Sequence, residues 1–216
     1  DWFVDFGPTR RKLAGLTSPV EIMGGLVQDP ARAAKLAALF PAALGDNGLP
    51  EGWEVKTFLD LFELKRGYDL PSKSRVPGPI PIVSSSGPTG WHDTAMAQGP
   101  GIVTGRYGTI GEVFECPTDF WPLNTTLYVC DFKGHPYWFV FHVLRGLDFR
   151  KFTDKAAVPG VNRNDIHREP LTMPPTNVQV GFESLVAPLM AKCRANREEN
   201  QTLAATRDLL LPKLMS

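Results

Sequence analysis

The chain has 216 residues, of which 43% are hydrophobic, and its 23 Lys and Arg balance 23 Asp and Glu. This length can bury one substantial core, and no apolar run reaches the ~20 residues that a membrane-spanning helix needs. The three cysteines lack C-x-x-C spacing, which argues against a disulfide framework and against a zinc site. These features indicate a soluble protein of a reducing, cytoplasmic compartment.

Residues 1–50 are predicted to form a connector. An aromatic segment at residues 2–6 ends at Gly7 and Pro8, and later prolines and glycines interrupt any regular element. Asp29 followed by Pro30 suits the cap and first position of a helix. The sequence therefore predicts one short helix, over residues 31–39.

Residues 51–175 are predicted to form a strand-rich domain. The pattern at residues 53–64 predicts a short strand followed by a helical turn. Further strands are expected at residues 80–83, 101–104, 111–115 and 125–130. Residues 136–147 are apolar nearly all round and exceed the usual strand length of about five or six residues, which favours a buried helix.

Residues 176–216 carry a repeat that is typical of a coiled coil. Alternating steps of four and three residues join Phe182, Val186, Leu189, Cys193, Asn196, Asn200, Leu203, Arg207, Leu210 and Leu214. Polar residues inside such a seam fix its register and partner number at a cost in stability. We therefore expect this helix to pair with a chosen partner instead of lying on its own domain's core.

Residues 99–124 combine strand-forming residues with closely spaced glycines, which predicts a tight hairpin. The hairpin would present Arg106, Tyr107 and Thr109. A cation, a stackable ring and a hydroxyl suit recognition of a phosphate or a base edge. The same glycines could also serve only to turn a strand.

Several blocks, in order, resemble the target-recognition domain of a type I restriction-modification specificity subunit. They are GIVTGRYGTIGEVFE at residues 101–115, FWPLNTTLYV at 120–129, AVPGVNRNDI at 157–166 and the two prolines at 174–175. In addition, WFVDFGPTR at residues 2–10 resembles the end of that family's central conserved helix, and LLLPKLMS at 209–216 resembles the end of its second conserved helix.

The resemblance implies an α+β fold, in which a twisted β-rich target-recognition domain (residues 51–175) precedes a long coiled-coil-type helix (176–216). It also implies a non-catalytic subunit that recognises double-stranded DNA. Its partners would be modification subunits, a restriction subunit, and another specificity half or a second copy bound through the helix. S-adenosylmethionine, ATP and magnesium would bind only to the partner subunits.

We expect four groups of residues to contact DNA, because Arg suits guanine, Asn suits adenine, and hydroxyls suit bases or phosphates. These are Lys73 and Arg75; Ser84, Ser85, Ser86, Thr89 and His92, beside Trp91; Arg106, Tyr107 and Thr109; and Lys151, Lys155, Arg163 and Asn164. Residues 51–169 contain thirteen Lys and Arg against fourteen Asp and Glu. Without a basic excess, this piece alone should bind DNA weakly.

Two other functions remain open. In a metal-dependent nuclease, Glu63 or Glu54 would hold a cation beside Lys65 or Lys56, with Asp46 as the second carboxylate. The four histidines have no metal-ligand spacing, and no nucleophile elbow, Walker loop or dinucleotide turn is present, so we expect no catalytic residue and no metal site. In a protein-interaction module, the seam helix would be the working part. A groove that holds Arg106, Lys155 and Arg163 together would favour DNA.

Overall fold

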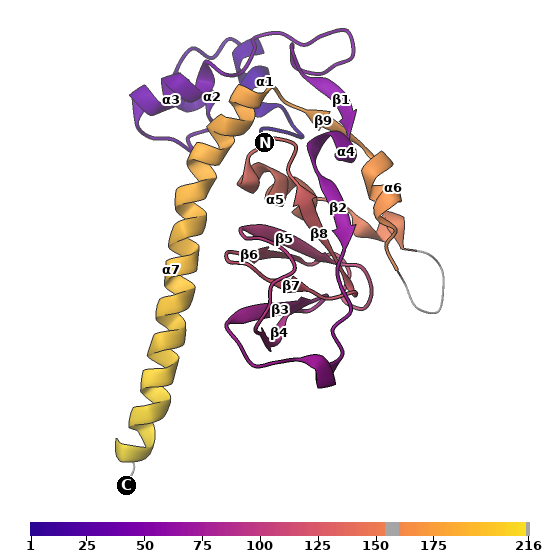
Figure 1. Cartoon of the computed structure of the whole chain (residues 1–216). Helices are drawn as coiled ribbons and strands as arrows, with labels where there is room; N and C mark the ends of the chain where they lie inside the picture. Colours follow the sequence, from indigo (N-terminus) through magenta and orange to yellow (C-terminus); the bar gives the residue numbers. More distant parts are fainter. Residues whose placement is uncertain (154–159, 215–216) are drawn as a thin grey trace.

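The computed structural model describes residues 1–153 and 160–214, with side chains up to residue 211. A small helical part is followed by a β-rich part, and a long final helix extends alongside them (Figure 1). The predicted α+β class, a β-rich domain followed by a long helix, is confirmed. Among the described residues, no helix is long and apolar enough to cross a membrane.

The helical part contains three short helices where the sequence predicted one. They are α1 (Gly7–Leu13), α2 (Pro19–Ile22) and α3 (Pro30–Ala37). Pro8 and Pro19 lie in the first two positions of α1 and α2, where a residue without an N–H loses no helical hydrogen bond. These prolines therefore begin helices instead of interrupting the chain. Asp29 caps α3 as predicted, since its carboxylate accepts hydrogen bonds from the N–H groups of Ala31 and Arg32 at 2.8 and 3.0 Å.

Residues 1–6 lie outside any helix, although the resemblance predicted the end of a helix there. Phe6 has a left-handed backbone with φ of 52°, a conformation that a continuous right-handed helix excludes. Trp2 is buried instead, with its ring 4.9 Å from that of Phe40 and 6.0 Å from that of Phe182. The opening segment thus joins the helical part to the final helix.

The β-rich part begins with the predicted strand and helical turn, β1 (Glu54–Thr57) and α4 (Phe58–Leu61), and continues with β2 (Glu63–Arg66), which was not predicted. Thr57 and Asp60 form a capping box at the start of α4, in which the N–H of Thr57 donates to the Asp60 carboxylate at 2.8 Å. β1 pairs antiparallel with β9 (Pro170–Met173) in a separate two-stranded sheet.

The central sheet has four antiparallel strands in the order β2-β8-β5-β6. It contains β5 (Gly101–Gly105), β6 (Val113–Cys116) and β8 (Thr126–Asp131), three strands that the sequence predicted. One face carries buried Leu64, Ile102 and Leu127 against α5 (Tyr137–Arg145), the predicted buried helix. Residues of α7 (Thr176–Leu214) pack against the same core.

A second sheet, in the order β4-β3-β7, packs on the other face of the central sheet. It consists of β3 (Ile80–Ser84), β4 (Gly87–His92) and β7 (Trp121–Pro122), of which only β3 was predicted. Glycine and proline give β4 and β7 weak intrinsic strand propensity, so their conformation depends on pairing with β3. The remaining elements are η1 (Ser72–Ser74), η2 (Phe149–Phe152) and α6 (Arg163–Arg168).

The outer edge of β2 is covered by α6. The N–H of Leu64 donates to Nε2 of His167 at 2.9 Å, and Nη1 of Arg163 donates to the carbonyl oxygen of Leu64 at 3.3 Å. Burial, with the nearby Arg163, lowers the pKa of His167, which suits an uncharged ring that accepts a hydrogen bond. Two side chains therefore bond the backbone groups that a neighbouring strand would otherwise bond.

Helix α7 is 39 residues long and continues through Pro188. Because proline has no N–H, the carbonyl oxygen of Ser184 loses its usual helical donor. Arg32 on α3 replaces that donor, with its Nη2 atom 3.0 Å from the Ser184 oxygen. The helical part of the chain thus supports α7 at the proline.

The first half of α7 packs on the protein's own core, which corrects the predicted seam. Phe182 and Val186 were assigned to a partner, yet both pack against buried residues of the same chain. The repeat gives the spacing of a helix face but not what covers that face. We call residues 178–194 the packed half and residues 195–214 the free arm, where every described side chain is exposed. Exposed seam residues are Leu189, Cys193, Asn196, Asn200, Leu203, Arg207 and Leu210, whereas the Leu214 side chain lies outside the described residues.

Candidate nucleic-acid interface

The loop between β5 and β6, residues 106–112, is shaped by glycines. Gly108 and Gly111 have φ angles of 78° and 94°, which glycine adopts readily. A Cβ atom on Gly105 would lie 1.7 Å from the carbonyl oxygen of Thr109, so the loop folds back directly onto the end of β5. The predicted hairpin is present, because β5 and β6 pair antiparallel.

Arg106 and Tyr107 are fixed at the backbone, and their side chains are half-buried and 36% exposed, respectively. Both N–H groups donate to the carbonyl oxygen of Thr125, at 2.8 and 3.1 Å, and the Arg106 oxygen accepts from the N–H of Val161 at 2.9 Å. The guanidinium carbon of Arg106 lies 4.4 Å from the centre of the Tyr107 ring. A stacked guanidinium still has N–H groups free for a phosphate or a guanine edge.

The second predicted group meets this hairpin at Ser85. Cβ atoms built on Gly105 and Gly108 would lie 3.3 Å from the Ser85 Cβ and 3.1 Å from its Oγ. Ser85 is only 9% exposed, so it supports the hairpin from the protein side. Ser84 is half-buried, whereas the hydroxyl-bearing residues Ser86, Thr89 and Thr109 are exposed.

His92, which was predicted to contact DNA, is buried at 5% exposure. Its Nδ1 atom lies 3.1 Å from the N–H nitrogen of Val76, and its ring packs 5.0 Å from that of Trp121. Alternation along β4 turns His92 inward and leaves its neighbour Trp91 63% exposed. The sequence predicts a loop here, because the glycine and proline of β4 have low strand propensity and this strand forms by pairing with β3.

The first predicted group lies beside the same β3-β4 hairpin. Lys73 is exposed in η1, and Arg75 is half-buried. The Nη1 atom of Arg75 would lie 3.8 Å from a Cβ built on Gly90 of β4. Its Nε atom is buried without a hydrogen-bond partner among the described residues. The first three groups therefore adjoin one another.

Members of the fourth group bond other parts of the protein. Lys151 pairs with Glu169 at 3.1 Å, and Arg163 bonds Leu64 at the edge of β2. Asn164 is exposed, and its N–H donates at 3.0 Å to Asn162, which is therefore the residue that caps α6. Lys155 lies outside the described residues.

The groove expected around Arg106, Lys155 and Arg163 stays a prediction, because Lys155 lies outside the described residues. A hollow at Arg163 is lined by Leu59, Asp60, Glu63, Lys133, Asn164 and His167. Its carboxylates oppose an approaching phosphate. Arg163 is exposed but bonds the Leu64 oxygen beside these carboxylates, whereas Arg106 is half-buried and stacks on Tyr107.

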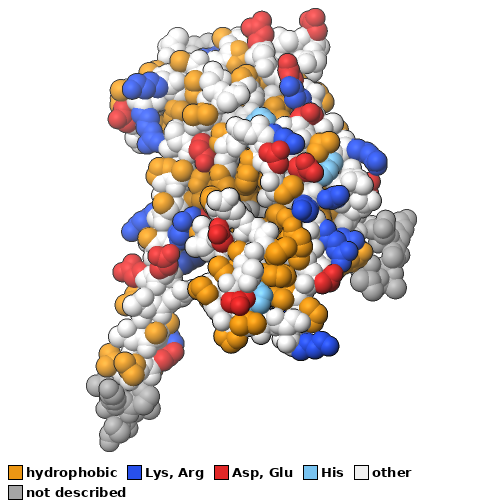
Figure 2. All heavy atoms as spheres, viewed as in Figure 1, with side chains coloured by type: hydrophobic (Ala, Val, Ile, Leu, Met, Phe, Trp, Pro, Cys, Tyr) orange, Lys and Arg blue, Asp and Glu red, His pale blue; other side chains and the backbone are white. Residues whose placement is uncertain are grey.

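Two cations near Arg106 were not among the predicted contacts. Lys65 and Arg66 are exposed at the end of β2, and the next residue, Gly67, donates its N–H to Thr126 at 3.1 Å. Since Arg106 bonds the adjacent Thr125, the ends of β2 and β5 flank the start of β8. Figure 2 shows Lys and Arg side chains over β2 and α6, with Asp and Glu between them. The buried Leu64 among polar neighbours could have identified this strand end.

The residues of the nuclease alternative are arranged as surface charges. The Lys56 Nζ atom pairs with the Glu54 carboxylate at 2.9 Å, and Asp46 is exposed in a turn. Across residues 1–153 and 160–214, no cluster of three or more His, Cys, Asp or Glu side chains is placed to hold a metal ion.

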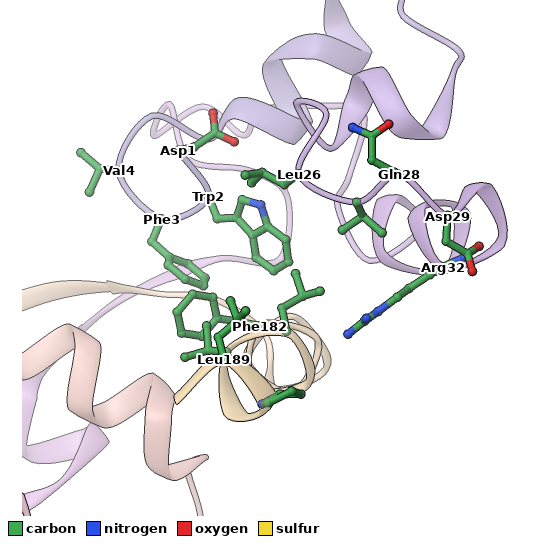
Figure 3. Close-up of a pocket in the computed structure, with 14 residues that line it drawn as sticks. Asp1, Trp2, Phe3, Val4, Leu26, Gln28, Asp29, Arg32, Phe182 and Leu189 are labelled. Carbon is green, nitrogen blue, oxygen red and sulfur yellow. The ribbon is translucent and has the colours of Figure 1, made fainter. Parts of the chain in front are cut away.

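An apolar concavity of about 660 Å³ lies at the base of α7. In Figure 3, Trp2 and Phe3 point toward Phe182, while Arg32 extends toward the helix from α3. Its lining includes Leu26 and Leu189, which are 69% and 65% exposed. The concavity therefore leads from the protein core to the exposed seam.

No protein-family model and no curated protein sequence matches the chain. Solved structures do match it. The type I restriction-modification S subunit from M. genitalium matches with a TM-score of 0.66 and 16% identity, over 80% of this chain and 47% of that one. A chain from a structure of type I R-M complex assembly and conformational transition matches with a TM-score of 0.54 and 16% identity, over 95% and 57% of the two chains.

The HsdS subunit from Thermoanaerobacter tengcongensis matches with a TM-score of 0.51 and 17% identity, over 92% of this chain and 51% of that one. The chain thus spans about half the length of the specificity subunits that it matches. Over most of its residues, this chain has the fold of type I restriction-modification specificity subunits.

Proposed function

We propose that this chain recognises a DNA sequence as one half of a type I restriction-modification specificity subunit and catalyses no reaction itself. The observation that carries the proposal is the match to an S subunit at a TM-score of 0.66 over 80% of the chain. The stacked Arg106 and Tyr107 on their glycine loop support it, because they offer a positioned guanidinium at the end of the central sheet.

The proposed contact surface extends from the β3-β4 hairpin across the 106–112 loop to the end of β2. Its members are Lys65, Arg66, Lys73, Arg75, Ser84, Ser86, Thr89, Arg106, Tyr107 and Thr109. Asn164 is a further exposed candidate, whereas Lys151 and Arg163 already bond other groups of the protein. Ser85 and His92 support the surface from within.

Charge is the reason to propose partners. The chain has no formal net charge, whereas DNA affinity rests largely on neutralising phosphates. Modification subunits would supply the remaining positive field, together with S-adenosylmethionine. A restriction subunit would bring ATP and magnesium, and the whole complex would act in the cytoplasm.

Substitution of Arg106 tests the proposal. If Arg106 bonds guanine, Arg106→Ala should weaken binding by about 1 to 3 kcal/mol and relax the preference at one base pair. If it bonds only phosphate, affinity should fall equally on all sequences and the salt slope should flatten by about one unit. The assay is binding of the chain, reconstituted with modification subunits, to matched and singly altered duplexes at several salt concentrations.

Lys35→Ala is the matched control, since Lys35 is an exposed cation on α3 in the helical part. It should leave both affinity and salt dependence unchanged. If Arg106→Ala behaves in the same way as this control, Arg106 does not contact DNA and the glycine loop is purely structural.

A second candidate function, a protein-interaction module, is favoured by the exposed leucines of the free arm. Leu203 and Leu210 are 59% and 45% exposed on one helix face. Changing both to Asp should convert a self-associated chain to a monomer in light scattering, whereas Ala205→Asp, off the seam, should not. A parent chain that stays monomeric at high concentration would rule out self-association. If the reconstituted complex methylates DNA at a specific sequence, DNA recognition is supported. A chain that acts only as a protein-interaction module would not direct such methylation.

The nuclease alternative has a direct test. Purified chain with magnesium should not cut DNA. If the chain cuts DNA and Lys65→Ala abolishes the cutting, the nuclease function replaces the proposed one.

A further inference from the structure

Polar bonds join the packed half of α7 to the β-rich part at three successive places. Gln179 bonds His135 at 2.7 Å; Glu183 accepts from the first N–H groups of α5 at 2.9 and 3.2 Å; and Arg194 pairs with Glu115 of β6. These bonds reach the loop before α5, the start of α5, and β6, respectively. Together they fix α7 along its packed half.

The ion pair between Arg194 and Glu115 is the last of these contacts before the free arm. The Glu115 side chain is only 10% exposed, and that of Arg194 is 41% exposed. Burial, with the Glu115 carboxylate, raises the pKa of the neighbouring Tyr137, so the Glu115 side of the pair lies in a poorly solvated environment. Removing one partner from such a pair leaves a poorly solvated charge without compensation.

Beyond Arg194 the helix has no support from its own chain among the described residues. Side chains 195–211 are all exposed, and residues 195–214 extend about 30 Å at ~1.5 Å per residue. A rotation of about 10° at Arg194 would displace the end of such a rod by about 5 Å, more than the ~3.4 Å between successive base pairs. A small change at the last contact therefore has a large effect at the tip.

We propose that Glu115 and Arg194 are positioning residues that set the direction of the free arm relative to the β-rich part. Through the arm they set the spacing between this recognition half and a second one. The spacing role rests on the proposed function, whereas the direction of the arm does not.

The direction is measured by electron paramagnetic resonance between two spin labels. One label is placed on exposed Cys130 of β8 and the other on Ala205→Cys in the arm, in a Cys193→Ser background. Buried Cys116 should stay unlabelled, because burial raises the pKa of its thiol to about 12. Dilution with unlabelled chain removes distances between copies.

Arg194→Ala and Glu115→Gln should each increase the width of the distance distribution between the two labels at least twofold. The exchanged pair, Glu115→Arg with Arg194→Glu, should narrow that distribution again. Arg197→Ala, an exposed cation one turn later, is the matched control and should match the parent. Circular dichroism identifies variants that fail to fold, and Glu115→Gln provides a variant without an uncompensated carboxylate.

Folded Arg194→Ala and Glu115→Gln variants with the parent's distribution would overturn the proposal. An exchanged pair that stays as broad as the single variants would also count against the ion pair.

The spacing role is tested with the reconstituted methyltransferase on two-part targets whose spacer differs by one base pair. The ratio of methylation rates between the correct and the altered spacer should fall several-fold in Arg194→Ala and not in Arg197→Ala. If a variant has a broadened distance distribution but an unchanged ratio of methylation rates, the spacing role is overturned. The role of the pair in setting the direction of the arm is not affected by that result. Absence of methylation on every target would contradict the proposed function and leave the arm measurement intact.

Discussion

The packed half and the free arm of α7 share one repeat but differ in what covers it. In the packed half, Phe182 contacts aromatic rings of the opening segment and of α5, at 5.1 Å from Phe3 and 6.3 Å from Phe139. In the free arm, Leu203 and Leu210 have the same spacing and face solvent. A heptad-like pattern therefore identifies an apolar helix face, while the occupant of that face depends on the tertiary structure.

The largest expected difference between the two halves is in stability. Phe182→Ala should lower the free energy of unfolding by about 3 kcal/mol, because it empties a site shared by two hydrophobic clusters. Leu203→Ala, in the free arm, should change it by less than about 0.5 kcal/mol. Urea unfolding at low protein concentration measures both, and equal losses would contradict the division of α7.

A smaller effect is expected at the proline. Arg32→Ala removes the donor to the Ser184 oxygen, which Pro188 cannot bond, and should cost about 1 kcal/mol. Lys35→Ala, another exposed cation on α3, is the control and should cost nearly nothing. If both variants unfold at the same urea concentration, Arg32 does not support the packed half.

The smallest effect concerns pH and lies outside α7. The pKa of His167 is lowered from 6.5 in the folded protein by burial and Arg163, so the unfolded chain binds the proton first as the pH falls. The stability that this group contributes is complete above pH 6.5 and is lost below it. Between about pH 7.5 and 5.5, where histidine titrates, His167→Gln should lose less stability than the parent. An equal loss would remove His167 from this role.

Elements with a strong local pattern were predictable from the sequence. The buried helix α5, the strands β5, β6 and β8 of the central sheet and the cap at Asp29 depend on periodicity and on nearby hydrogen bonds. By contrast, β4 and β7 contain residues of low strand propensity and form through pairing with β3. Helix α1 was missed because Pro8 was interpreted as a breaker instead of a starting residue.

The candidate site was predictable only in part, for a related reason. Gly105, Gly108 and Gly111 identified the hairpin, because glycine permits the positive φ angles and the close backbone approach that this turn needs. The burial of His92 depends on which face of β4 turns inward, and that requires knowledge of the strand. Arg66 and Arg106 lie at strand ends on either side of β8, because Gly67 bonds Thr126 and Arg106 bonds Thr125, about 60 and 20 positions away in the chain.

The cover of β2 by α6 has a consequence for biosynthesis. Leu64 and His167 are 103 residues apart, so the ribosome completes the strand long before it completes the helix. At translation rates of about 5 to 20 residues per second, that interval lasts about 5 to 20 s. During this time, the outer backbone groups of β2 are open to pairing with other nascent chains. Slower translation of the codons between Leu64 and His167 should thus increase the insoluble fraction of the product. A separate peptide that contains α6, supplied during synthesis, should decrease that fraction.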